Sequence, residues 1–162
     1  MIYRVTCDKS NISDRALFYF AVCDIMFTML KYDENLSAEK VERINPVALA
    51  FVGDAVYSLF VRKSLVAAKD YKAGDLNKLS AGVVCAAAQA RLSEKLESVF
   101  TDEEKDIFRR ARNAKKPTRA KHASVADYNA STGLEAVIGY LYLIGKHDRL
   151  DEILNYAENE LQ

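Results

Sequence analysis

The sequence predicts an all-α protein with one folded domain at residues 45–162 and an N-terminal extension at residues 1–44. Three observations support this class. Only two prolines and six glycines, the residues that most often interrupt helices, occur in 162 residues. Half of the residues are apolar and 28% are charged, which allows a buried core. Apolar side chains recur at helical spacing, and no segment alternates with period two for long enough to predict a strand.

The N-terminal half of the domain predicts two main helices. Asn45 is a favourable N-cap and Pro46 fits the first helical position, so we expect a helix over about residues 45–65. A second helix is expected to run without a break over about residues 75–91, because its apolar positions keep helical spacing. A short turn or helix should follow at residues 92–99.

The C-terminal half predicts three further helices. Thr101-Asp102-Glu103-Glu104 is typical of a capping box, in which a threonine hydroxyl and a glutamate satisfy each other's backbone N–H groups. That helix should end near Arg112. A long helix is predicted over residues 124–144, with Gly145 as its C-cap. A last helix is predicted over about residues 147–160.

Basic residues are concentrated in one segment. The chain carries 23 basic and 23 acidic residues, which by itself argues against a general nucleic-acid binder. One stretch, however, holds seven basic residues and no acidic one: Arg109, Arg110, Arg112, Lys115, Lys116, Arg119 and Lys121. We interpret residues 113–123, which Pro117 interrupts, as an exposed loop. The cluster is either a solvated surface or a site of phosphate contact.

The cysteines and the apolar N-terminal stretch indicate in which cellular compartment the protein works. Cys7, Cys23 and Cys85 form no CxxC pair, so neither a zinc site nor a disulfide framework is predicted, and free cysteines are typical of the cytoplasm. The apolar stretch from Ala16 to Leu30 contains Asp24 and is shorter than the ~20 residues of a membrane span. The sequence therefore predicts a cytoplasmic protein without a membrane segment.

Two acidic residues lie in otherwise apolar helical segments. Asp54 follows Gly53, and Glu135 lies two residues after Gly133. A buried carboxylate needs a partner, and the ordinary partner is a lysine, an arginine or a helix N-terminus. A small residue beside each acid also allows an ion to approach closely. Mg²⁺ is the alternative partner, since it is often held by one or two carboxylates together with water and phosphate.

The segments around these acids resemble the two motifs of the ribonuclease III domain. Phe51-Val52-Gly53-Asp54-Ala55-Val56 is similar to its signature helix, and Glu135-Ala136-Val137-Ile138-Gly139 is similar to its second catalytic helix. The resemblance covers about residues 45–156. It implies a ribonuclease III-like helical endonuclease domain in which Asp54 and Glu135 are catalytic and bind Mg²⁺.

The same resemblance implies a function. Such a domain hydrolyses phosphodiester bonds of double-stranded RNA and leaves 5′-phosphate and 3′-hydroxyl ends. It works as a homodimer, and it matures precursor 23S ribosomal RNA, with a ribosomal protein or the pre-ribosome as a further partner. The resemblance also implies that the basic segment binds RNA, through Arg109, Arg110, Arg112, Asn113, Lys115, Lys116, Arg119 and Lys121.

Departures from the general family pattern indicate a subgroup. Ala50 and Thr132 stand where most members carry Glu and Asp, and Val47 replaces a further Glu. We also expect no C-terminal double-stranded-RNA-binding domain. These features are similar to the Mini-ribonuclease III subgroup, a catalytic domain alone, as are residues 86–90 and 110–115.

Two other functions and one question about the N-terminus stay open at this point. A non-catalytic RNA-binding module of the same fold is the main alternative, and retention of Asp54 and Glu135 argues against it. A helical interaction protein would leave both motifs unexplained. Residues before Met29 are either an over-extended gene start or an additional helix on the surface.

Overall fold

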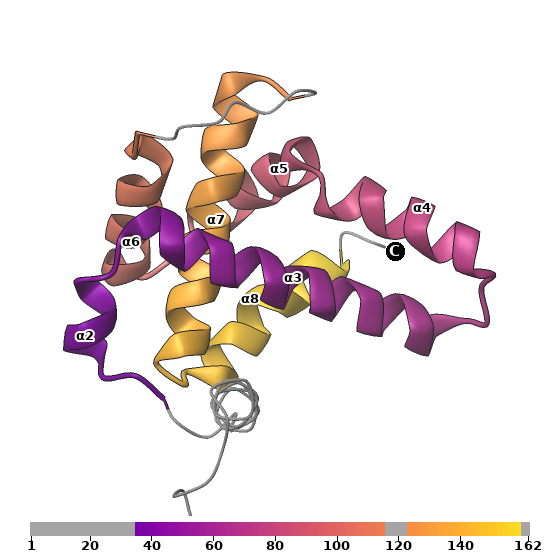
Figure 1. Cartoon of the computed structure of the whole chain (residues 1–162), viewed down its shortest axis with the longest axis horizontal. Coiled ribbons are helices and arrows are strands. Elements are labelled where there is room, and N and C mark those ends of the chain that lie inside the picture. Colours follow the sequence, from indigo (N-terminus) through magenta and orange to yellow (C-terminus); the bar gives the residue numbers. More distant parts are fainter. Residues whose placement is uncertain (1–34, 116–122, 160–162) are drawn as a thin grey trace, which may run out of the picture. The chain divides into compact units, whose positions relative to one another are not determined.

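The structure is a computed structural model that describes residues 35–115 and 123–159. Within these ranges the secondary structure is entirely α-helical, which confirms the predicted class (Figure 1). The helices are α2 (Ala38–Glu42), α3 (Pro46–Ala68), α4 (Ala73–Val84), α5 (Ala86–Leu96), α6 (Asp102–Asn113), α7 (Val125–Leu143) and α8 (His147–Asn159). None of these helices is long and apolar enough to cross a membrane. The stretch before Met29 and the basic residues Lys116, Arg119 and Lys121 lie outside the described residues.

The compact unit that contains the seven helices begins at Leu36. The Leu36 backbone N–H donates to the Leu143 carbonyl at 2.8 Å, and Val41 of α2 is completely buried. Residues 36–44, which were predicted as part of the extension, therefore pack with the helices that follow them.

α7 lies at the centre of this unit and packs against α3, α5, α6 and α8 (Figure 1). Every residue from Ser131 to Leu141 is buried except Glu135. A helix that is surrounded by others has to be apolar on all sides. Glu135 is the exception because it faces a cleft, as described below.

The three predicted caps, Asn45, Thr101 and Gly145, are confirmed. The Asn45 side chain accepts a hydrogen bond from the Val47 backbone N–H at 2.9 Å, and Thr101 forms both bonds of the capping box with Glu104. Gly145 follows α7 with φ of 73°, a left-handed conformation that glycine adopts without strain. Its N–H donates to the Tyr142 carbonyl, so the last turn of α7 is closed as in a Schellman motif.

The predicted unbroken helix over residues 75–91 is wrong, because α4 and α5 are separate helices. Cys85 adopts an extended backbone conformation, with φ −70° and ψ 151°, and the chain turns there. The apolar spacing continues across the break, so periodicity cannot reveal it. A side-chain bond spans the break: the Gln89 side-chain amide donates to the Val84 carbonyl at 3.0 Å.

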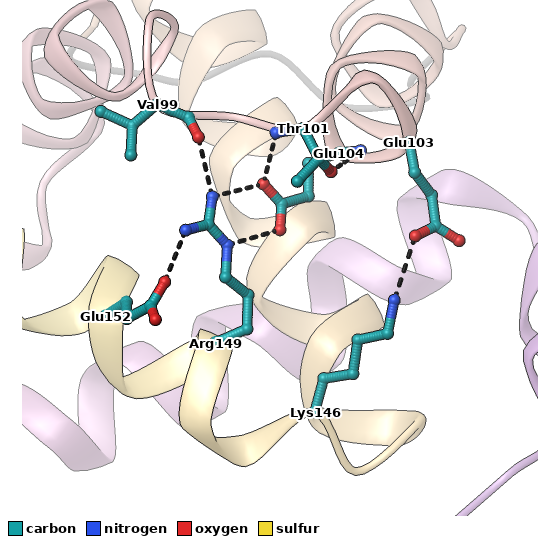
Figure 2. Close-up of polar contacts among 7 residues, drawn as sticks. All are labelled: Val99, Thr101, Glu103, Glu104, Lys146, Arg149 and Glu152. Atoms are coloured by element: carbon teal, nitrogen blue, oxygen red, sulfur yellow. Dashed lines mark hydrogen bonds and ion pairs between the residues drawn. The ribbon is translucent and has the colours of Figure 1, made fainter.

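A buried ion pair joins α6 to α8 (Figure 2). Glu104 is 2% exposed, and Arg149 donates to its two carboxylate oxygens from Nε and Nη2, each at 2.9 Å. Arg149 also donates to the Val99 carbonyl at 2.8 Å and to Glu152 at 2.6 Å. Burial alone raises the pKa of Glu104, but the hydrogen bonds from Arg149 and from the Thr101 backbone outweigh it, and the pKa lies below its ordinary value.

Candidate active site

The site begins where the backbones of α3 and α7 touch. A Cβ atom on Gly53 would lie 1.7 Å from the carbonyl oxygen of Glu135, and a Cβ atom on Gly139 would lie 2.1 Å from the carbonyl oxygen of Leu49. Real Cβ atoms do not approach other atoms so closely. The two glycines therefore allow a helix contact that any other residue would prevent. Asp54 follows Gly53 directly, so this contact brings the two predicted acids to the same place.

Both acids line one cleft with a volume of about 440 Å³. Its walls come from three parts of the fold: α3 contributes Val47, Ala50, Phe51 and Asp54, the corner between α4 and α5 contributes Val84 and Ala86, and α7 contributes Tyr128, Ser131, Thr132 and Glu135. Asp54 is exposed and Glu135 is half-buried. Neither carboxylate is enclosed in the core.

The three positions where this chain lacks an acid, Val47, Ala50 and Thr132, also line the cleft. Ala50 and Thr132 are 4% and 5% exposed. The hydroxyl of Thr132 donates to the Tyr128 carbonyl at 2.8 Å, within its own helix, and the hydroxyl of Ser131 donates to the same carbonyl at 3.0 Å. Because Ala50 and Thr132 line the same cleft, a carboxylate at either residue would add its charge beside Asp54 and Glu135.

The cleft offers a small set of donors for a divalent cation. In the described part of the chain, no group of three or more His, Cys, Asp or Glu side chains could hold a metal ion. Asp54 and Glu135 supply two carboxylates in one solvent-accessible cleft. This set fits Mg²⁺, which often takes one or two carboxylates and completes its ligands with water and substrate phosphate. A site that required four protein ligands would not fit.

The predicted basic residues do not share one environment. Arg109 pairs with Asp106 at 2.6 Å, and Arg110 donates to the Glu42 carbonyl of α2 at 3.1 Å. These two arginines therefore make contacts within α6 or between α6 and α2. Arg112, Asn113 and Lys115 lie exposed at the C-terminal end of α6. The other predicted basic residues, Lys116, Arg119 and Lys121, lie outside the described residues.

Sequence reasoning missed part of the cleft. Tyr128, which is not among the predicted site residues, lines the cleft with Glu135. Its spacing of four residues to Thr132 and seven to Glu135 places all three on one face of a helix, which is the signal that could have identified it. No local signal could have identified Val84 and Ala86, since their place depends on the break at Cys85.

Comparison with known proteins decides the family. Residues 47–146 match the Ribonuclease III domain, which includes both acids and the central contact of α3 with α7. The chain is 43% identical over 132 residues to the Mini-ribonuclease 3 of Thermoanaerobacter sp., covering 82% of this chain and 93% of that protein. The chain belongs to the Mini-ribonuclease 3 branch of the ribonuclease III family. This is a family of endoribonucleases that act on double-stranded RNA and generally depend on a divalent metal.

Further relatives and a solved structure agree with this assignment. The Mini-ribonuclease 3 of Brevibacillus brevis is 44% identical over 113 residues, covering 70% of this chain and 84% of that protein. The crystal structure of a protein from Fusobacterium nucleatum aligns with a TM-score of 0.68 at 32% identity, covering 74% of this chain and 96% of that one. The similarity covers 84–96% of the length of these three proteins.

Proposed function

We propose that this protein is an endoribonuclease that cleaves double-stranded RNA by metal-assisted hydrolysis of phosphodiester bonds. The observation that carries the proposal is the pairing of Asp54 and Glu135 in one cleft, which lies open to solvent so that an RNA backbone can reach both carboxylates. Precursor 23S ribosomal RNA in the cytoplasm is the proposed substrate, and a ribosomal protein or the pre-ribosome is the proposed further partner.

Asp54 and Glu135 are the residues proposed to hold Mg²⁺. When bound there, Mg²⁺ supplies activation of a water molecule and neutralisation of the charge on the leaving oxygen. The protein contributes two carboxylates, and the close backbone contact between Gly53 and Glu135 fixes the position of α3 against α7. With few protein ligands, the substrate phosphate completes the site, so metal and RNA are expected to bind cooperatively.

The basic segment is proposed to hold the duplex through its phosphates. A catalytic domain that binds RNA by itself has to provide cationic side chains on its own surface, and double-stranded RNA is recognised mainly through phosphates and 2′-hydroxyls. Arg112 and Lys115 are exposed and are the most favourable described candidates, with Asn113 beside them. Arg109 and Arg110 each use one guanidinium nitrogen on a partner within the protein, so they have fewer donors left for phosphate.

A homodimer is proposed from the surface of α3. Phe51, Leu59 and Val66 are 81%, 63% and 65% exposed and follow one face of the helix. The helices that pack against α3, which are α4, α6, α7 and α8, leave these three side chains exposed, and an exposed apolar patch is typical of a surface that a partner covers. A second copy of this chain is the proposed cover, so that two clefts act on the two strands of one duplex.

The test is cleavage of a duplex RNA in the presence of Mg²⁺. Wild type should cut, whereas Asp54→Asn and Glu135→Gln should cut at least ~100-fold more slowly, because a ligand of the metal is lost. Both variants should still bind the duplex through the basic segment, more weakly than wild type when Mg²⁺ is present. Asp75→Asn, an exposed acid in the first turn of α4, is the matched control and should cut as wild type does. Equal cutting by wild type and Asp54→Asn contradicts the mechanism.

The alternative function is a non-catalytic RNA-binding module. It predicts that wild type binds the duplex without cutting it at any Mg²⁺ concentration. Retention of both acids in one cleft favours the enzyme.

A further inference from the structure

The corner between α4 and α5 forms one wall of the cleft. Val84 is the last residue of α4 and Ala86 is the first residue of α5, and both line the cleft with Asp54 and Glu135. Between them, Cys85 adopts an extended conformation. Because a helix break can bend easily, the position of this wall depends on the contacts that hold the corner.

The side chain of Gln89 holds the corner across the break. Its Nε2 donates to the carbonyl oxygen of Val84 at 3.0 Å, and the carbonyl groups at a helix C-terminus have no partner within their own helix. The backbone carbonyl of Cys85 accepts from the N–H groups of Ala88 and Gln89, at 3.0 and 3.1 Å. The Cys85 bonds close the first turn of α5, and the Gln89 side chain attaches that turn to the end of α4.

The Oε1 atom of the Gln89 amide does not stabilise the fold. Gln89 is 1% exposed, and its Oε1 is buried without a hydrogen-bond partner among the described residues. A buried polar atom without a partner destabilises the folded state, whereas an apolar side chain of similar shape would avoid this cost. The benefit of glutamine at this position is therefore the one bond that it makes, which fixes the geometry of the cleft wall.

We propose that Gln89 is a positioning residue for RNA cleavage, which acts through Val84 by fixing the α4–α5 wall against which the duplex is held beside Asp54 and Glu135. The inference rests on the proposed function. Gln89 itself is buried and contacts neither the substrate nor the reacting atoms. Its loss should therefore weaken productive binding of the duplex more than it slows the reaction of bound duplex.

The experiment compares Gln89→Met with Ser93→Ala. Ser93 is 2% exposed on the same helix, and its hydroxyl donates to the Ala90 carbonyl at 2.7 Å, so it is a matched buried polar residue that does not line the cleft. Gln89→Met should raise the KM for a duplex RNA about 10-fold and leave kcat within about twofold. Amide hydrogen exchange over residues 82–88 should be about 10-fold faster in the same variant. Ser93→Ala should change neither quantity.

Each result decides the proposal. Equal KM values for Gln89→Met and Ser93→Ala overturn it, even when exchange at the corner is faster, because the bond would then be structural only. If Gln89→Met does not fold, Gln89→Asn replaces it, since a side chain shorter by one methylene cannot reach Val84. If wild type cuts no duplex, the proposed function fails, and the Kd for duplex RNA replaces KM; an equal Kd for wild type and Gln89→Met then refutes the role of Gln89.

Discussion

The contact between α3 and α7 leaves no room for a side chain on Gly53. Replacing Gly53 by alanine tests whether this contact is what brings Asp54 and Glu135 into one cleft. The added Cβ atom would lie 1.7 Å from the carbonyl oxygen of Glu135 and 2.8 Å from the backbone nitrogen of Gly139. Both atoms belong to the backbone of the central helix, so neither can rotate away as a side chain would. The two helices have to move apart until the new contacts reach 3.4 Å or more.

The size of the expected loss of stability follows from this displacement. Overpacking a core typically costs about 1–3 kcal/mol, and a clash with backbone belongs at the upper end, so we expect Gly53→Ala to lower the free energy of unfolding by about 3 kcal/mol. For a chain of this size that corresponds to a fall in Tm of about 10 °C. Asp54 follows the substituted residue and Glu135 belongs to the contacted helix. Since displacement by about 1 Å can reduce a rate ~100-fold, we expect at least that loss of cleavage.

Two other glycines provide controls for this prediction. A Cβ atom on Gly82, in α4, would meet nothing within 4 Å, so Gly82→Ala should stabilise the protein by about 0.5–1 kcal/mol through helix propensity. A Cβ atom on Gly133 would lie 2.7 Å from the ring of Phe108, a side chain that can adjust, so Gly133→Ala should fall between the other two variants.

The assays for the glycine series are thermal unfolding by circular dichroism and duplex cleavage, measured well below the Tm of each variant. A Gly53→Ala protein that melts within about 2 °C of wild type and cleaves at the wild-type rate would refute the reasoning, because the pairing of the acids would then not depend on the backbone contact.

Three further variants test the ion pair, the basic segment and the dimer. Arg149→Met leaves Glu104 buried without its partner and should lower the free energy of unfolding in urea by about 3–5 kcal/mol. The folded-state pKa of Glu104 lies below its ordinary value of 4.5, so its contribution to stability is present above that pH and is lost as the pH falls through the folded-state pKa; it should be smaller in the variant, which keeps only the bonds from Thr101. Arg112→Ala combined with Lys115→Ala should weaken RNA binding and reduce the slope of log K against log salt by about 2. Leu59→Glu places a charge in the proposed interface and should yield a monomer by light scattering.

Each of these variants has a matched control. Arg43 pairs with Glu39 on the surface, where both side chains are more than three-quarters exposed, so Arg43→Met should leave stability almost unchanged. Lys105→Ala removes an exposed charge of α6 outside the basic cluster and should leave the salt slope unchanged. Tyr156→Glu alters another exposed apolar side chain, on α8, and should leave the dimer intact. If a variant behaves like its control, the role assigned to that ion pair, basic segment or dimer interface is contradicted.

The helices of this protein were largely predictable because their ends depend on neighbours in the sequence. Asn45, Thr101 and Gly145 cap their helices through bonds that span a few residues, and such bonds can be inferred from residue type alone. The apolar character of α7 on all sides likewise indicates a central helix. The break at Cys85 was not predictable, since both α4 and α5 keep helical periodicity and the bond from Gln89 to Val84 forms only after the chain has turned.

The candidate site divides in the same way. By itself the sequence determined the chemistry: two motifs with one acid each, Ala50 and Thr132 in place of further acids, and a local excess of basic residues. Only the tertiary structure decided that Asp54 and Glu135, about 80 residues apart, line one cleft, and that Arg110 bonds to α2. The physical reason is distance along the chain. Capping and helix periodicity act over about four residues, whereas a cleft is made by side chains and backbones that meet only when separate helices pack.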